Sequence, residues 1–554
     1  MSKLKIVPLG GLGKVTQNMF LYEYENEILI VDCGIGFPDS YMPGVDILIP
    51  DIDYLLQQLD AGKQIIGMVL THGHDDHIAA TPYIMPVLPK FPIYASELTA
   101  GFAEQRMRDG EDPRVVSVAG DNELVKLGTH FSFRLLPVTH SVPDTRHVVI
   151  NTPEGIIYHG SDFKLDPNPI DGQLTDIEHI SELKEENVLC MLIDCLRVEN
   201  QKWVESESLA GPAILGAMQE TEGKVVMTLM SSHIHRIQQT IDACEKLKRK
   251  VVFIGRSVEQ NVEIALRLNK LHIPEGMKVD KKFIADVADT ELCVIVAGSQ
   301  GQEGSSLMRA VYGEHRILRI NPRDTVIFSA DAIPGNELSY FGAIDELCRN
   351  KVHVLYPDVL PDLHKSGHAS APEQQEILGL IKPKYVMPVG GEDRHRYKFF
   401  ELVASKLGYD EKHVLIPESG EIIGFQNREV SAEGALNLRP QIVDGLGVGD
   451  VGPMVLSDRR TLGQAGIVMV LITKEHGEYD LKNVKVVSRG FVFMKEADEV
   501  IQFIKNEVAT VVNEELRKKT TEVQMKALIE KRLSRRLYKI IRREPMIVAE
   551  ILEV

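Results

Sequence analysis

The sequence predicts an α/β protein built from several domains. At 554 residues the chain has room for about three or four domains of ~150 residues each. An apolar run typical of a buried strand, at 65–70, ends directly in a cluster of polar side chains, which places those side chains on a loop after a strand. Further along, runs typical of strands at 224–229, 250–254 and 291–297 alternate with helical patterns. Such alternation is typical of an α/β unit.

The overall charge does not by itself indicate a nucleic-acid-binding protein. The chain has 80 acidic against 62 basic residues, which gives a net charge of −18. A polyanionic ligand must therefore be met by a local basic surface. Two basic runs, at 246–250 and 394–398, are candidates for a track that follows a single strand, although such runs are more commonly solvated helix faces.

Cysteine usage and hydropathy favour a cytoplasmic protein with no membrane partner. The six cysteines lie mostly in apolar surroundings without CxxC spacing, as expected of small core residues in a reducing compartment. The first residues lead straight into a strand pattern, without the apolar segment of a signal peptide. No apolar run approaches the ~18 residues that a membrane-spanning helix needs.

A cluster at 72–77 is the strongest functional signal in the chain. It holds His72, His74, Asp76 and His77 directly after the strand at 65–70. Neutral imidazoles and ionised carboxylates are ligands of Zn²⁺ or Mn²⁺, and the spacing lets His72 and His74 bind one ion while Asp76 and His77 reach a second. The alternative is a solvated polar turn, but such turns rarely concentrate His and Asp without Ser, Asn or Pro. We therefore predict a metal centre.

Further candidates follow other predicted strands. His140 and Asp162 each come after an apolar run that delivers a side chain to a sheet edge. A carboxylate that bridges two ions about 3.5–4 Å apart would complete a centre that generates hydroxide at neutral pH. Asp32 is a candidate for orienting a ligand histidine, whereas we expect His147 and His159 to be structural.

These motifs resemble the metallo-β-lactamase superfamily, and later motifs narrow the resemblance to β-CASP nucleases of the ribonuclease J family. The similar stretches extend over nearly the whole chain. They are VDILIPD at 45–51, HSVPD at 140–144, DFK at 162–164, IHRIQQ at 234–239, GSQG at 298–301, IPGNE at 333–337, SGHA at 366–369 and REPMI at 543–547.

The resemblance implies an αββα sandwich of the metallo-β-lactamase type, formed by residues 1–205 and 370–433. A β-CASP α/β domain would be inserted between them at 206–369. A turn-rich linker at 434–452 would lead to a small C-terminal α+β domain at 453–554, through which the family often forms dimers or tetramers.

Within the C-terminal domain the residue pattern is specific enough to predict individual elements. We expect strands at 454–459, 467–472 and 484–487, and helices at 496–517 and 522–538.

The resemblance also assigns roles to site residues. His72, His74 and His140 would hold one ion, with Asp76 and His77 on the other and Asp162 as the bridge. Asp194 matches the carboxylate of the first β-CASP motif and His368 the histidine of the second. In this family a hydroxide attacks the phosphodiester, and the histidine stabilises or protonates at the scissile phosphate. The expected catalytic residues are Asp76, Asp194 and His368.

A second group matches or adjoins the RNA-binding motifs of the family. Such residues hold backbone phosphates and a 5′-monophosphate in a pocket too small for a triphosphate, and they position the strand without reading its sequence. The group is Ser232, His235, Arg236, Ser299, His364, Ser366 and His368.

One departure from the family pattern concerns a metal ligand. Members usually have Pro-Val-His-Gly-Glu where this chain has Pro-Val-Gly-Gly-Glu at 388–392. Gly390 supplies no donor atom, so we expect a weakened second site and more dependence on added Mn²⁺ or Mg²⁺, unless Glu392 or His395 compensates. Smaller departures are His233, where the family tends to have Asn, and Cys195-Leu196, where it tends to have Ser-Thr.

Three functions follow as hypotheses. The first is a metal-dependent 5′-to-3′ exonuclease on 5′-monophosphorylated single-stranded RNA, with some internal cleavage, in RNA turnover and maturation. The alternative is a weakly active or inactive paralogue or trapped variant that binds RNA and supports a partner nuclease. The partners expected are single-stranded RNA and an RNA-degradation complex or paralogue. A third, a small-molecule lactonase or thioesterase, would need neither Asp194 nor the loop at 366–368.

Overall fold

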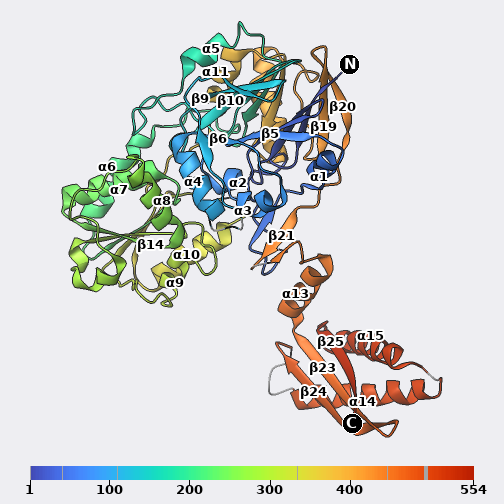
Figure 1. The fold of residues 1–554 in the computed structure, drawn as a ribbon. Coiled ribbons are helices and arrows are strands. Elements are labelled where there is room, and N and C mark those ends of the chain that lie inside the picture. Colours follow the sequence, from blue (N-terminus) through green and yellow to red (C-terminus); the bar gives the residue numbers. More distant parts are fainter. Residues whose placement is uncertain are drawn as a thin grey trace. The chain divides into compact units, whose positions relative to one another are not determined.

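The computed structural model describes residues 2–39, 41–108, 110, 112–333, 335–445, 447–491, 497–518 and 520–554. The chain forms two compact units, one of Met1–Phe37 with Leu48–Gln441 and one of Pro38–Ile47 with Ile442–Val554. Figure 1 labels their elements.

Two facing sheets form a sandwich in the larger unit. Their strand orders are β20-β19-β1-β2-β3-β5-β6-β7 and β18-β12-β11-β10-β9-β8. The first sheet contains β1 (Leu4–Pro8), β2 (Phe20–Tyr24), β3 (Glu27–Val31), β5 (Gln64–Val69), β6 (Ile93–Ala95), β7 (Val116–Val118), β19 (Glu421–Gln426) and β20 (Glu429–Ala435). The second contains β8 (Val125–Leu127), β9 (Phe131–Pro137), β10 (Arg146–Thr152), β11 (Gly155–His159), β12 (Cys190–Asp194) and β18 (Tyr385–Val389).

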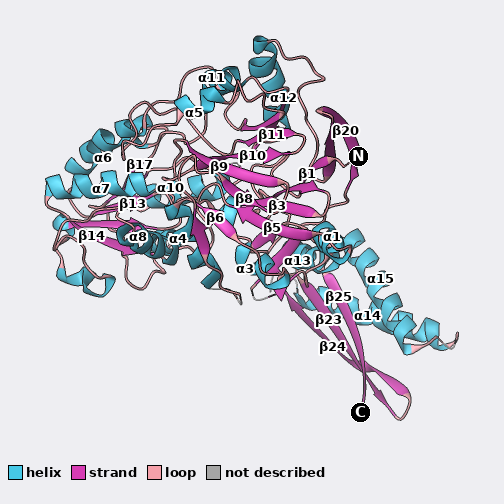
Figure 2. Ribbon diagram, turned by 45° about the horizontal axis from the view of Figure 1, so that its top comes forward, coloured by secondary structure: helices cyan, strands magenta, loops and turns pink. Residues whose placement is uncertain are grey.

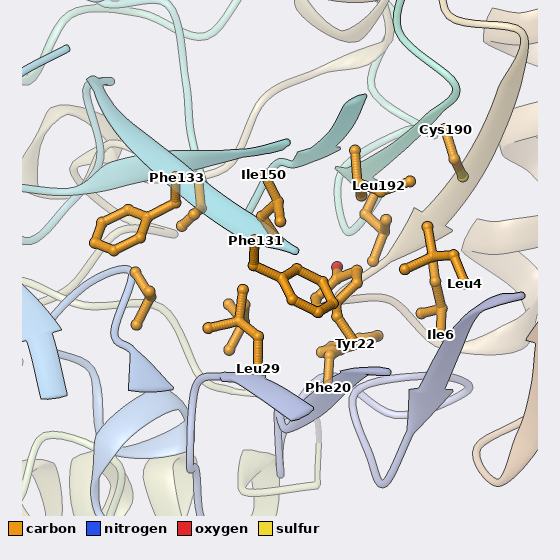
Figure 3. Close-up of a cluster of buried hydrophobic side chains, with 14 of the residues drawn as sticks. Leu4, Ile6, Phe20, Tyr22, Leu29, Phe131, Phe133, Ile150, Cys190 and Leu192 are labelled. Atoms are coloured by element: carbon orange, nitrogen blue, oxygen red, sulfur yellow. The ribbon is translucent and has the colours of Figure 1, made fainter. Parts of the chain in front are cut away.

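Apolar side chains from both sheets meet in one core. Phe20, Tyr22 and Leu29 point from the first sheet toward Phe131 and Phe133 of the second (Figure 3), and all of them are buried. Because side chains alternate along a strand, every second residue of these strands enters this layer. The sandwich predicted from the resemblance is therefore present.

Helices flank the sandwich (Figure 2). On the second sheet, Ile180 of α5 and Ile377 of α11 pack on the outward side chains of Tyr158 and Met191. The helices around the sandwich are α1 (Asp53–Asp60), α2 (Asp75–Ile78), α3 (Thr81–Ile84), α4 (Glu97–Arg108), α5 (Ile177–Glu182), α11 (Ala371–Ile381) and α12 (Asp393–Phe399).

Between β12 and β18 the chain forms a separate parallel sheet in the order β14-β15-β13-β16-β17, with helices around it (Figure 1). This is the expected inserted α/β unit, including its predicted strands. Its strands are β13 (Val225–Thr228), β14 (Lys250–Ile254), β15 (Leu292–Val296), β16 (Thr325–Phe328) and β17 (His353–Leu355). Its helices are α6 (Ala210–Gln219), α7 (Ile234–Leu247), α8 (Arg256–Arg267), α9 (Ser306–Val311) and α10 (Glu337–Arg349).

Short helical turns connect several of these elements. They are Met85–Val87, Glu207–Leu209, Lys281–Asp286, Asp289–Glu291, Pro361–Leu363, Phe400–Ala404 and Ser405–Leu407.

The smaller unit is an α+β structure in which two helices pack on a sheet with the order β24-β23-β25. Val468 and Val470 of β23 meet Val512 of α14 and Leu533 of α15 in a buried core. The elements are α13 (Pro453–Ala465), β23 (Ile467–Glu475), β24 (Glu478–Arg489), α14 (Ala497–Leu516), α15 (Glu522–Ile541) and β25 (Met546–Glu553).

The prediction of a strand at 454–459 was wrong, because these residues lie in α13. A short apolar run does not by itself distinguish a strand from a helix, whereas Pro453 at the first helical position and Gly466 after the last are typical helix ends. Glu496 of the predicted helix at 496–517 lies outside the described residues, as does Pro334 of the motif at 333–337. β25 was not predicted.

The expected linker contains short strands. The remaining strands are β4 (Ile47–Ile49), β21 (Gln441–Asp444) and β22 (Gly447–Val448), and β21 pairs antiparallel with β22. Within the described part of the chain, no helix combines the length and the apolar character needed to cross a membrane.

Replacing Phe133 by Ala should lower the free energy of unfolding of the larger unit by about 3–5 kcal/mol, because it leaves a cavity between the two sheets. Phe133 is 0% exposed, whereas Phe283 is 57% exposed and is the matched control. We expect Phe283→Ala to change that free energy by no more than about 0.5 kcal/mol. Urea unfolding followed by circular dichroism measures both, and equal effects would contradict a core between the sheets.

Candidate active site

The candidate site residues follow the carboxyl ends of strands that run in a common direction. In the first sheet, β3 and β5 are parallel. In the second, β9 and β11 both pair antiparallel with β10 and so share one direction, which β12 and β18 continue. Loops after such strands emerge at the same edge of a sheet. The residues that this geometry brings to the edges are Asp32, His72, His140, Asp162, Asp194 and Gly390.

Four donor atoms converge on one point. His72 Nε2 and His140 Nε2 each lie 3.1 Å from His74 Nδ1. Asp162 Oδ2 is 3.6 Å from His72 Nε2 and 3.7 Å from His140 Nε2. Ligand bonds of about 2.05 Å in a tetrahedron give donor separations of about 3.3 Å. The four donors therefore fit one tetrahedral divalent ion.

A second donor group shares Asp162 with the first. His77 Nε2 lies 3.7 Å from Asp76 Oδ2 and 3.7 Å from Asp162 Oδ2. The three donor atoms of Asp76, His77 and Asp162 are within 4.8 Å of one another. Because Asp162 belongs to both groups, its carboxylate has the position of a bridge. The cluster as a whole fits divalent metal binding.

The electrostatics of the cluster also suit cations. Burial, followed by the neighbouring histidines, holds the pKa values of His72, His74 and His140 well below their usual range, so their ring lone pairs are free to bind a metal. For His77, burial lowers the pKa, but Asp76, Asp32 and Asp162 outweigh it and raise the pKa to about 10. A local field that favours a proton on His77 also favours a metal ion there.

Asp32 makes the contacts that an orienting role requires. Its Oδ2 accepts a hydrogen bond from His77 Nδ1 at 2.7 Å, and its carboxylate also accepts from the backbone amide and the hydroxyl of Thr71, each at 2.8 Å. With Nδ1 committed in this way, Nε2 of His77 is the nitrogen that faces the donor group. Asn18 also belongs to this site, because its side-chain amide lies 3.1 Å from His77 Nε2. Sequence analysis missed this residue.

Asp194 and His368 form a pair beside Asp162. His368 Nδ1 donates to Asp194 Oδ2 at 2.9 Å and lies 4.0 Å from Asp162 Oδ2. Burial lowers the pKa of His368, but Asp194 and Asp162 outweigh it and raise the pKa to about 9. The pair thus places an imidazole that can carry a proton next to the donor cluster.

The loop that carries His368 is also tied to a ligand histidine. The carbonyl of Gly367 accepts a hydrogen bond from His140 Nδ1 at 2.6 Å. Only glycine fits at 367, because a Cβ atom would lie 2.8 Å from the Cβ of Ser141. Ser366 Oγ accepts from the amide of His368 at 3.1 Å, so this hydroxyl shapes the turn.

Gly390 lies where a side chain would enter the site. Its φ is +69°, and a Cβ atom there would lie 3.4 Å from Asp194 Oδ1 and 3.6 Å from Asp162 Oδ1. Neither suggested substitute ligand reaches the cluster. The carboxylate of Glu392 contacts Arg394, and His395 Nδ1 accepts from the amide of Glu392 at 3.2 Å. In the described residues, neither belongs to a metal-binding donor group.

Arg236, for which we predict a phosphate contact, is buried and bonded within the protein. Arg236 is 0% exposed. Its guanidinium forms two bonds to Glu207 at 2.5 and 2.6 Å, and donates to Ser329 Oγ at 2.7 Å and to the carbonyl of Leu363 at 2.9 Å. All three guanidinium nitrogens have partners within the protein, so Arg236 joins segments of the chain. A buried arginine is normally paired within the protein. The partners of Arg236 lie far from it in the sequence, so the local pattern did not reveal them.

The other expected phosphate ligands lie around the inserted sheet and the His368 loop. Ser232 and Ser299 follow the parallel strands β13 and β15 and so lie at one edge of that sheet. His364 Nε2 is 3.7 Å from Asp331 Oδ2, and His235 Nε2 is 3.2 Å from Asp171 Oδ2.

Three histidines in the region are structural. His233 begins α7, where its ring accepts from the amide of Arg236 at 3.4 Å, a role that Asn also performs. The ring of His147 donates to the carbonyl of Ser161 at 3.1 Å, next to Asp162. His159 Nδ1 is 2.6 Å from the hydroxyl of Tyr22.

Four family models match the chain. They are the metallo-beta-lactamase superfamily over residues 12–180, the ribonuclease J beta-CASP domain over 222–347, the Zn-dependent metallo-hydrolase RNA specificity domain over 362–417, and the ribonuclease J C-terminal domain over 454–554.

Full-length relatives agree with these matches. The chain is 33% identical to "Ribonuclease J 1" of Streptococcus pyogenes, covering 100% of this chain and 98% of the relative. It is 35% identical to "Ribonuclease J" of Thermus thermophilus (99% and 95%), and 31% identical to "Ribonuclease J2" of Bacillus subtilis (100% and 99%).

A solved structure of a protein of unknown function from Enterococcus faecalis aligns with a TM-score of 0.54 at 16% identity, over 76% of this chain and 100% of that one. This likeness supports the fold alone. The donor cluster, the inserted domain and the full-length relatives together lead to one conclusion: the chain belongs to the ribonuclease J family, and it is a metal-dependent ribonuclease of the β-CASP type.

Proposed function

We propose that the chain removes nucleotides in the 5′-to-3′ direction from 5′-monophosphorylated single-stranded RNA, and that it also cuts internally, in RNA turnover and maturation. The observation that carries the proposal is the pair of donor groups sharing Asp162, with the Asp194–His368 pair beside them. A small-molecule hydrolase would need the donor groups but not that additional pair.

We infer that the two groups hold two ions. The first group, with three imidazoles, suits Zn²⁺, while the group of Asp76, His77 and Asp162 is richer in carboxylates and also suits Mn²⁺ or Mg²⁺. Bound there, the ions would activate water as the nucleophile and stabilise negative charge on phosphate oxygens. Because Gly390 supplies no ligand atom, the second ion would be held less tightly than the first.

The remaining roles belong to side chains of the chain itself. Asp194 holds Nδ1 of His368 at 2.9 Å, which leaves Nε2 to donate a proton or a hydrogen bond to the scissile phosphate or the leaving oxygen. Ser232, Ser299 and His364 would receive phosphates near the 5′ end. Hydroxyl and imidazole donors recognise phosphate without reading bases, which supports degradation that tolerates many sequences.

Gly390 favours a second candidate function, a weakly active or trapped form that binds RNA and supports a partner nuclease. The intact donor groups favour the enzyme. In both cases we propose a cytoplasmic location, self-association as a dimer or tetramer through the C-terminal unit, and membership of an RNA-degradation complex.

The first test is release of mononucleotides from 5′-monophosphorylated single-stranded RNA in Mn²⁺. We expect the chain to be active and Asp76→Ala to slow release at least about 100-fold, because the second group then keeps only His77 and the shared carboxylate. The same RNA with a 5′-triphosphate should be degraded more slowly. Asp75→Ala is the matched control, since the adjacent Asp75 pairs with Arg106 at 3.0 Å instead.

The variant Gly390→His separates the two candidates. Its ring would add a ligand, so we expect half-maximal activity at a lower Mn²⁺ concentration. The left-handed backbone at 390 should cost about 1–2 kcal/mol of stability, which thermal unfolding would detect. If the parent chain is inert and the Gly390→His variant is active, the proposal of an active ribonuclease is wrong and the supporting subunit is favoured.

Replacing Asp32 by Asn should weaken metal affinity about 10–100-fold. The amide keeps the shape of the side chain, and asparagine tolerates the φ of +62° at this position, but it no longer offers two acceptor oxygens to His77 and Thr71. Calorimetric titration with Zn²⁺ measures the change. Asp51→Asn is the control, because buried Asp51 accepts backbone amides of Asp53 and Arg439 away from the cluster. Equal losses in both variants would contradict an orienting role for Asp32.

A further inference from the structure

Arg197 carries a positive charge that has no ion-pair contact among the residues that the structure describes. Its side chain is half-buried, and its Nε atom is shielded from solvent without a hydrogen bond. Within the described residues, its guanidinium has neither an ion-pair partner nor a side-chain hydrogen bond. Shielding part of a charged group from water without a hydrogen bond is unfavourable, so the guanidinium is available to an anionic ligand.

The backbone places Arg197 between the two catalytic loops. It lies three residues after Asp194, and it forms a parallel β-bridge with Ser370, two residues after His368. Asp194 and His368 are themselves joined at 2.9 Å. Arg197 is therefore fixed next to the reacting centre by the same two segments that build it.

The charges around Arg197 indicate the direction in which its side chain extends. His364 has a pKa well below its usual range, through burial first and then through charges that include Arg236 and Arg197. Burial raises the pKa of Asp331, and Arg197 opposes that shift. Both shifts indicate that the charge of Arg197 acts on these two side chains.

His364 and Asp331 adjoin the edge expected to receive phosphates. Strands β13, β15 and β16 are parallel, so the residues that follow them, including Ser232, Ser299 and Asp331, emerge at one edge of the inserted sheet. Arg197 thus faces this edge from the sandwich side. Arg236 differs in this respect, since it donates to Glu207, Ser329 and Leu363, whereas within the described part of the chain the guanidinium of Arg197 donates to no side chain.

We propose that Arg197 binds a backbone phosphate of the RNA next to the scissile position, with its guanidinium donating to non-bridging oxygens. This inference rests on the proposed function and adds a cationic contact that the sequence motifs did not identify. A planar guanidinium can donate two parallel hydrogen bonds to a phosphate, which suits a site that must fix the position of the strand.

The test measures binding of a fluorescently labelled, 5′-monophosphorylated single-stranded RNA to the full chain carrying Asp76→Ala, by anisotropy at several salt concentrations. Adding Arg197→Gln should weaken binding about tenfold. It should also make the slope of log affinity against log salt shallower by about 0.7, the value for one phosphate contact on a single strand. Arg197→Lys should keep the slope and recover part of the affinity, since lysine keeps the charge but cannot donate two parallel hydrogen bonds as the planar guanidinium does.

Arg323→Gln is the matched control. Arg323 also lacks an ion pair among the described residues, but it precedes β16 and therefore lies at the opposite edge of the sheet from Asp331. The Arg323→Gln substitution removes the same charge and should change the affinity for RNA less than twofold. Thermal unfolding of Arg197→Gln should match that of its parent, because no partner is lost.

Unchanged affinity and slope in Arg197→Gln would overturn the inference while leaving the proposed function intact. Equal changes in Arg197→Gln and Arg323→Gln would also overturn it, since they would indicate only a general effect of charge. If the Asp76→Ala parent fails to bind RNA at any salt concentration, the proposed function fails first, and that result is visible before any arginine variant is compared.

Discussion

The carboxylate of Asp162 is the interaction on which the rest of the site depends. It is the donor that both groups share, and it also lies 4.0 Å from His368. Burial raises the pKa of Asp162 to about 7, so its ionised form is costly unless cations lie nearby. The five surrounding histidines do not offset this cost equally, because His72, His74 and His140 are held neutral while only His77 and His368 have raised pKa values. Divalent ions are the groups that make the cluster electrostatically consistent.

The position of Asp162 is in turn set by the sandwich. The preceding strand β11 is held between β10 and β12, and His147 donates to the carbonyl of Ser161. The opposite ligands come from the other sheet, through Asp32, Thr71 and His77. The metal site therefore depends on the packing of one sheet against the other, since a shift between them would separate ligands that must lie within a few ångströms.

A buried ion pair links the inserted domain to the catalytic loop. Glu207 lies where the chain enters the insertion, and Leu363 lies just before the loop that carries His368. Arg236 bonds to both. Removing one member of such a pair leaves an uncompensated buried charge. This buried ion pair thus fixes the edge of the inserted sheet that carries Ser232 and Ser299 relative to the donor cluster, which gives an arginine in that motif a structural role.

Sequence reasoning succeeded where the signal is local. The cluster at 72–77 and the strands before His140 and Asp162 could be read directly, because parallel strands bring their following loops to one edge. The partners of Arg236, the isolation of Arg197 and the contact of Asn18 with His77 depend on residues far apart in the chain. The prediction for 454–459 failed for a different reason: an apolar run of a few residues fits both a strand and a helix, and only Pro453 and Gly466 distinguish them. β25 pairs with a strand some 80 positions earlier (Ile467 with Met546), which no local pattern reveals.

Packing does not explain why residue 390 is a glycine. A Cβ atom at this position would lie at ordinary contact distance from the carboxylates of Asp194 and Asp162, so the site has room for a side chain. The left-handed backbone favours glycine, but histidine is among the residues that adopt this conformation more often than most. The fold therefore accommodates a ligand at 390 at modest cost, and its packing does not require glycine there. In the proposed two-ion site, Gly390 would act on how tightly the second donor group holds its ion, since the first group and the Asp194–His368 pair do not include residue 390.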